Sequence, residues 1–208
     1  MTAGPLTAAR IAEAMAAITA RDAALNALHA LHGPPEPRIR NPGYETLLRA
    51  IVSQQVSTAA AAAIWRKLEA GVGNPADPRI LAATTVEALR AFGLSRQKAS
   101  YAISLASHVQ DGTLPLDSLP ADNEEAIALL SSVRGLGRWS AEIYLLFAEG
   151  RADIFPAGDL AVQIQAGRIW LDGARPTERQ LRLLAEPFAP HRGVVALFCW
   201  HCYNAPPL

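Results

Sequence analysis

Two short stretches of this sequence combine residue types that could act on a substrate. In the first, Val133 to Ala141, a Gly-x-Gly turn is followed by a helical pattern. A helix that begins after such a turn leaves backbone N–H groups at its positive end, where they can hold a phosphate whatever base it carries. In the second, Ile154 to Asp159, a lone carboxylate follows a corner rich in Pro and Gly. Together they predict an enzyme that works on a nucleic-acid backbone without metal chemistry.

Each stretch also has a simpler interpretation. The turn is expected to expose the amides of residues 135–139, with Gly135 and Gly137 permitting a positive φ and close approach, but it could be an ordinary helix–helix turn. An Asp after Gly at a helix start is typical of an N-cap, so Asp159 could serve only as that. The two roles are compatible, because a capping carboxylate can also face a cleft, where the helix dipole helps to keep it ionised.

Aromatic and amide side chains add a second group of candidates. Trp139 and Trp200 lie in strongly apolar helical segments, so they either pack in the core or line a pocket. A flipped-out base needs stacking surfaces, and an alkylated base is a cation, which aromatic faces attract. Gln54 and Gln55 interrupt an apolar helical stripe. They form either a surface turn or a side chain that enters the duplex in place of an extruded base.

Composition predicts an all-α globular protein. Half of the 208 residues are hydrophobic and 18% are charged, which excludes a disordered chain. Alanine dominates many segments and no segment alternates with period two, so roughly ten helices are expected. No apolar run reaches the roughly 18–20 residues of a membrane span, and the first ten residues do not resemble a secretory signal. We therefore expect a cytoplasmic protein, associated with the nucleoid through DNA.

Charge argues weakly against nucleic acid, because 19 basic residues balance 19 acidic ones. However, all the basic residues except Lys67 and Lys98 are arginines, which suit bidentate contact with phosphate. Cys199 and Cys202 flank His201 without a second ligand pair at metal-binding spacing, so they are expected in the core rather than at a metal.

The helical pattern can be divided at capping residues and at prolines. Loops are expected at 33–42, at Pro75 and Pro78, and at 111–120. Asp22, Ser57, Ser95, Asn123 and Thr177 are expected helix caps, and Thr84 or Thr85 is another. The expected helical ranges are 7–30, 44–68 with a break before Ser57, 85–91, 96–110, 123–132, 139–148, 159–170, 177–184 and 193–203.

Five blocks in a fixed order give the chain a family resemblance. They are Ile51–Ser57, Phe92–Ala99, Val133–Ala141, Ile154–Asp159, and Pro190–Gly193 leading to Trp200. From about Asp22 to Tyr203 the chain resembles the helix-hairpin-helix DNA glycosylases, and within them the 3-methyladenine DNA glycosylase II group. The resemblance implies two helical lobes with a cleft between them. The N-terminal helices, residues 1–40, would pack with the C-terminal lobe, residues 151–208. Residues 41–150 would form the other lobe, with the hairpin at about 124–149.

The resemblance also implies roles for individual residues. The hairpin that grips the DNA backbone corresponds to Gly135, Leu136, Gly137 and Arg138. In some relatives a monovalent cation, Na⁺ or K⁺, binds the carbonyls near Ser131, Val133 and Leu136. Asp159 matches the catalytic aspartate and Gln55 the intercalating position, with its neighbour Gln54 as the other candidate. Trp139, Trp200 and Tyr144 match the base pocket.

Departures from the family pattern reduce the number of activities that the resemblance allows. Relatives that also cut the strand carry a nucleophilic lysine at the position of Trp139, so no Schiff base is available there. Iron–sulfur relatives need four C-terminal cysteines, and this chain has two. Ile143 stands where some relatives have a pocket Tyr, with Tyr144 next to it, which bears on the range of bases accepted.

These features predict a monofunctional glycosylase that flips alkylated bases, such as 3-methyladenine and 7-methylguanine, out of duplex DNA and hydrolyses the N-glycosidic bond. We expect no cofactor beyond a structural cation, double-stranded DNA as the partner, no membrane association, and a monomer. One alternative is an enzyme of the same fold that acts on uracil, mismatched thymine or hypoxanthine. The other is a non-catalytic helix-hairpin-helix DNA-binding module, which would leave Asp159 and the tryptophans without a role.

Overall fold

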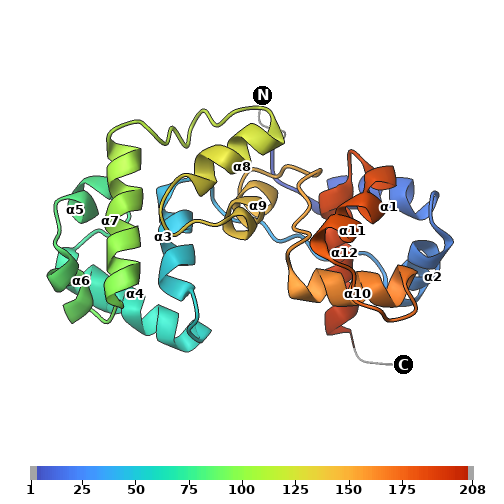
Figure 1. The fold of residues 1–208 in the computed structure, drawn as a ribbon, viewed down its shortest axis with the longest axis horizontal. Helices are drawn as coiled ribbons and strands as arrows, with labels where there is room; N and C mark the ends of the chain where they lie inside the picture. The colour runs from blue at the N-terminus through green and yellow to red at the C-terminus, as the bar shows by residue number, and fades with distance from the viewer. Residues whose placement is uncertain (1–3, 206–208) are drawn as a thin grey trace. The chain divides into compact units, whose positions relative to one another are not determined.

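The computed structural model describes residues 4–205, and this part of the chain is helical without a strand, as the sequence predicts (Figure 1). It divides into two compact units. One joins the residues up to Ile39 with those from Leu145 onward, and the other is Arg40–Tyr144, so the boundary falls inside one helix. No helix among residues 4–205 combines the length and apolarity needed to cross a membrane.

The discontinuous unit, which we call the terminal unit, has the apolar helix α12 (Arg192–Asn204) in its core. Helix α10 (Leu160–Trp170) and the N-terminal helix α1 (Ala8–Thr19) pack on α12, and α2 (Ala23–His32) packs on α1 and α10. Helix α11 (Glu178–Ala185) and the 3-10 turn η1 (Glu186–Phe188) complete it. Segments from the two ends of the sequence therefore share one hydrophobic core.

Asp22 links these segments through its two carboxylate oxygens. Oδ1 caps α2 by accepting the Leu25 N–H at 2.8 Å, as the sequence predicts, and Oδ2 accepts the Trp170 Nε1–H at 2.9 Å. The ring of Trp170 stacks on Phe188, with centroids 5.7 Å apart. A single cap therefore also joins α2 to the end of α10.

The continuous unit, which we call the central unit, is built around α7 (Arg96–Gln110). Helices α3 (Tyr44–Ser53), α5 (Pro78–Ala82) and α6 (Val86–Ala91) pack on α7, and α4 (Thr58–Val72) packs on α3 (Figure 1). The side chains of Ser57, Thr85 and Ser95 cap α4, α6 and α7, at predicted positions. The hairpin pair follows as α8 (Asn123–Ser131) and α9 (Arg138–Phe147), which ends beyond the boundary between the units.

Two local predictions need correction. Pro78 does not belong to a loop. It occupies the first turn of α5, where its missing N–H costs nothing, and Asp77 caps the helix through the Arg79 amide. Asp122 caps α8 and accepts from the amides of Glu124 and Glu125, both at 2.9 Å. Asn123 is therefore the first helical residue rather than the cap.

Candidate functional site

The turn between α8 and α9 depends on glycine at one of its two glycine positions. Gly135 has φ +96°, and a Cβ built there would lie 2.3 Å from the Tyr101 ring on α7. Gly137 has no positive φ, contrary to the expectation for both glycines, and a Cβ there would meet nothing within 4 Å. Gly135 is thus required by the protein's own packing, whereas Gly137 leaves open space beside the start of α9.

Not all the amides of this turn are available to a phosphate, although the sequence suggested that they would be. The Leu136 N–H donates to the Val133 carbonyl at 3.0 Å, so it serves the turn and is not available to a phosphate. Helix α9 begins at Arg138, and the Gly137 carbonyl accepts the Ala141 N–H at 3.0 Å. Amides in the first turn of a helix have no preceding turn to receive them. The donors that remain for an outside acceptor therefore lie at the start of α9.

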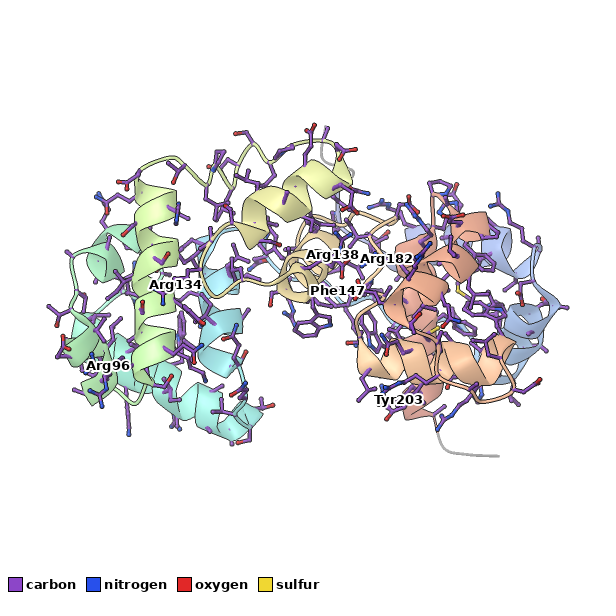
Figure 2. All side chains as sticks on the ribbon, viewed as in Figure 1. Arg96, Arg134, Arg138, Phe147, Arg182 and Tyr203 are labelled. Atoms are coloured by element: carbon purple, nitrogen blue, oxygen red, sulfur yellow. The ribbon has the colours of Figure 1, made fainter. Side chains whose placement is uncertain are left out.

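Ion pairs hold the Arg138 side chain. Its terminal nitrogens donate to Glu124 at 2.8 and 2.6 Å, and Nε donates at 3.0 Å to Glu142, which is 2% exposed. Hydrogen bonding to Glu124, joined by the charge of Glu142, raises the pKa of Arg138 above its usual range. Arg138 thus ties α8 to α9 through its side chain. Arg134, labelled in Figure 2, is exposed on the turn and is not among the predicted site residues.

The loop between α3 and α4 holds the two candidate glutamines differently. Gln54 is partly buried, and its Nε2 donates to the Gly135 carbonyl at 3.0 Å, which joins this loop to the hairpin turn. Gln55 is exposed and has φ +55°, in the left-handed region that non-glycine residues rarely adopt. These positions favour Gln55 as the side chain presented outward and Gln54 as its support.

Lys98 strengthens the same loop from α7. Its Nζ donates to the Val52 carbonyl at 2.9 Å, at the end of α3, and burial lowers the pKa of the ammonium. A cation at the C-terminal end of a helix also interacts favourably with the helix dipole. The sequence placed Lys98 in the first turn of α7 but gave no signal for this long-range contact.

A hollow of about 400 Å³ lies beside this loop within the central unit. Trp139 and Tyr144 line it together with Leu47 and Ile143, and both glutamines contribute to its wall. Trp139 is 50% exposed, whereas Tyr144 is 2% exposed and its hydroxyl accepts the Gly43 N–H at 2.8 Å. The structure thus brings together two of the three predicted pocket aromatics. Trp139 presents an exposed ring to the hollow, and the buried Tyr144 holds the wall through its bond to Gly43.

Asp159 lies in the terminal unit at the start of α10, with Trp200 beside it. Its Oδ1 caps the helix by accepting the Val162 N–H at 3.1 Å and also accepts the Trp200 Nε1–H at 2.9 Å. The indole is 7% exposed and packs against Phe147, with ring centroids 5.6 Å apart. Trp200 is therefore a core residue, and its indole N–H orients the carboxylate of Asp159. Its place in the base pocket stays a prediction.

The segment leading to Asp159 is fixed by two arginines. Arg192 at the start of α12 forms a bidentate ion pair with Asp153, at 2.8 and 2.6 Å. Arg182 of α11, labelled in Figure 2 with Phe147, donates to the Phe155 carbonyl at 3.2 Å. The Pro/Gly-rich corner is thus a supported segment that sets the position of the carboxylate.

Cys199 and Cys202 are buried on α12, which packs against α10, the helix that Asp159 caps. Burial, with smaller effects of Cys202 and Asp159, raises the pKa of the Cys199 thiol, and burial raises that of Cys202 to about 11. Neutral thiols are poor metal ligands. In the described part of the chain, no group of three or more His, Cys, Asp or Glu side chains is arranged to hold a metal ion.

Comparisons with known proteins show to which family this chain is similar. Residues 48–190 match the model of the HhH-GPD superfamily of base excision DNA repair proteins. DNA-3-methyladenine glycosylase 1 of Schizosaccharomyces pombe is 31% identical over 161 residues, covering 76% of this chain and 71% of the relative.

Two solved structures are similar over nearly the whole chain. The crystal structure of a DNA-3-methyladenine glycosidase from Bacillus halodurans has a TM-score of 0.77 and 31% identity, covering 90% of this chain and 88% of the other. The S. pombe 3-methyladenine DNA glycosylase Mag1, in complex with abasic DNA, has a TM-score of 0.76 and 28% identity, covering 92% and 95%.

Proposed function

This chain belongs to the HhH-GPD superfamily of base excision DNA repair proteins, and on that premise we propose that it is a monofunctional DNA glycosylase for alkylated bases. It would flip a base such as 3-methyladenine or 7-methylguanine out of duplex DNA and hydrolyse the N-glycosidic bond. The products are the free base and an abasic site. The observation that carries the proposal is the carboxylate of Asp159, held by a helix amide and by the Trp200 indole.

DNA binding is assigned to the central unit. The amides at the start of α9, with open space beside Gly137, would hold a backbone phosphate without reading the base. Arg138 contributes its backbone, because its side chain is engaged with Glu124 and Glu142. Gln55 would enter the stack in place of the flipped base, while Gln54 holds the loop on Gly135.

The flipped base would enter the hollow of about 400 Å³ that Trp139 and Tyr144 line. Unstacking a base costs a few kcal/mol, and less for a damaged base, which favours extrusion at the lesion. The exposed face of Trp139 suits a cationic alkylated base, because the ring attracts a desolvated cation.

Asp159 would act on the sugar rather than on the base. A ring-alkylated base is a good leaving group, so the step needs no strong general acid. As the bond from sugar to base lengthens, positive charge develops on the sugar, and an ionised carboxylate stabilises it and can position the attacking water. Trp200 is a positioning residue, since it keeps one oxygen of Asp159 in place. The indole of Trp139 cannot form a Schiff base, so no strand cleavage is proposed.

The proposed hydrolysis uses no cofactor. A Na⁺ or K⁺ ion held by the hairpin carbonyls of Ser131, Val133 and Leu136 would be structural and would add a positive charge to the turn. The oxygen-rich turn fits such an ion. The Ser131 hydroxyl is buried without a hydrogen-bond partner among the described residues. The Val133 carbonyl accepts one hydrogen bond at 3.0 Å and keeps a second lone pair.

The test is release of 3-methyladenine and 7-methylguanine from methylated duplex DNA by the wild type and by Asp159→Asn. The amide oxygen of Asn can still accept from Val162 and Trp200, so the fold and DNA binding should persist. The rate should fall at least about 100-fold, as when a preorganised electrostatic group is removed. Thermal unfolding and affinity for a duplex with an abasic-site analogue are the controls.

Two other outcomes would contradict the proposed function. Near-wild-type release by Asp159→Asn would remove this carboxylate from the chemistry. If the wild type binds DNA but releases neither base, duplexes with uracil, mismatched thymine or hypoxanthine would separate another lesion class from a DNA-binding module.

A further inference from the structure

A second hollow, of about 520 Å³, lies between α3 and α4 in the central unit and has no role in the proposed reaction. It shares Thr46, Ala50 and Ser53, one face of α3, with the hollow beside Trp139, and Arg40 also lines both. A nucleotide next to the flipped one is therefore within reach of this second hollow.

Arg49 is held in one orientation at the wall of this hollow. Its Nε donates to Glu45 Oε1 at 2.7 Å, and its guanidinium carbon lies 3.7 Å from the centroid of the Trp65 ring. Trp65 is itself fixed, because it is 5% exposed and its Nε1 donates to Glu69 at 2.6 Å. A long arginine normally loses rotamer freedom when it binds a ligand, and here much of that freedom is already lost.

The two contacts leave the terminal donors of Arg49 unused. No described residue accepts a hydrogen bond from Nη1 or Nη2, and the side chain remains 49% exposed. The planar terminal fork matches two oxygens of a phosphate, to which arginine binds in bidentate fashion.

Glu45 is the acidic residue in the lining of the hollow, and it forms an ion pair with Arg49. Glu45 limits the attraction for anions in general while it orients the Arg49 guanidinium.

We propose that Arg49 binds a backbone phosphate of the DNA next to the lesion, in the hollow between α3 and α4. This inference rests on the proposed function, because it requires bound duplex DNA. It also explains how a chain with 19 basic and 19 acidic residues can bind a polyanion. One oriented arginine beside the site would replace part of the broad basic surface common in DNA-binding proteins.

The test is the salt dependence of duplex binding by Arg49→Gln, Arg49→Lys and the wild type, with an abasic-site analogue as the lesion. Each phosphate contact contributes about 0.9 to the slope of log affinity against log salt. Arg49→Gln should lower that slope by about 0.9 and weaken binding roughly tenfold, the loss expected for one exposed charge-assisted hydrogen bond. Arg49→Lys should keep the slope and lose only part of the affinity, since it keeps the charge without the fork.

Arg66→Gln is the matched control, because Arg66 is exposed on α4 and does not line the hollow, so its slope should equal that of the wild type. Thermal unfolding of each variant reports any loss of the packing on Trp65. A wild-type slope and affinity for Arg49→Gln would overturn the proposal. So would weaker binding with an unchanged slope, which would assign Arg49 to a nucleobase contact or to packing. If the wild type itself fails to bind or excise, it is the proposed function that fails.

Discussion

The two units hold their proposed functional groups by different means. In the central unit, backbone conformation and backbone carbonyls hold the loop and the hairpin turn in place. Gly135 and Gln55 have positive φ, and the carbonyls of Val52 and Gly135 accept hydrogen bonds from side chains of other segments. In the terminal unit side chains dominate, and Asp159 is oriented by Trp200 on a corner fixed by arginines. Changes in the central unit should therefore alter conformation and DNA affinity, whereas changes in the terminal unit should alter the rate.

The largest effect in this comparison is expected for Gly135→Ala. The alanine would have to adopt φ +96°, and its Cβ would collide with the Tyr101 ring, so the free energy of unfolding should fall by about 2–4 kcal/mol. Urea unfolding measures the change. Gly137→Ala is the control, because its Cβ meets no protein atom within 4 Å. It should cost less than about 1 kcal/mol of stability and weaken DNA binding. Equal destabilisation by both variants would contradict the distinction between the two glycines.

A smaller effect, on rate alone, is expected for Trp200→Phe. Phenylalanine keeps an aromatic ring against Phe147 but loses the hydrogen bond to Asp159. The single-turnover excision rate should fall roughly tenfold, about the effect of one charge-assisted hydrogen bond, with duplex affinity unchanged. Trp170→Phe in the same unit loses the bond to Asp22 and should leave the rate unaltered. Weaker duplex binding by Trp200→Phe at an unchanged rate would instead assign Trp200 to DNA contact.

The smallest effects separate the two glutamines. Gln55→Gly relieves a left-handed φ, so stability should stay within about 1 kcal/mol of the wild type, while lesion binding weakens severalfold. Gln54→Ala removes the bond to Gly135 and should cost about 1 kcal/mol of stability. Fluorescence of 2-aminopurine placed beside the lesion, together with thermal unfolding, distinguishes the two. Loss of base extrusion only in Gln54→Ala would make Gln54 the intercalating residue.

Local chemistry made much of this fold predictable. Asp22, Ser57, Ser95, Asp159 and Thr177 all cap helices as the sequence indicates, because capping depends only on residues three positions apart. The missed helix α5 carried a readable signal too, an Asp cap followed by Pro in the first turn.

The contacts that shape the candidate site depend on distant residues and were not predictable in this way. The bond from Gln54 to Gly135 spans 81 positions, and the one from Trp200 to Asp159 spans 41. The ion pairs of Arg138 and the contact of Lys98 with Val52 likewise exist only once the helices have packed. Family resemblance could indicate which residues matter, but not what each one touches.

The bond between Gln54 and the Gly135 carbonyl has a consequence for redesign. Residues 53–57 and 133–137 are joined by this bond and support each other, although they lie far apart in the sequence. A loop transplanted from a relative would present a donor that is not matched to the position of the Gly135 carbonyl, and a rebuilt hairpin would move the carbonyl that supports Gln54. Efforts to retune this scaffold should therefore exchange both segments as a single cassette.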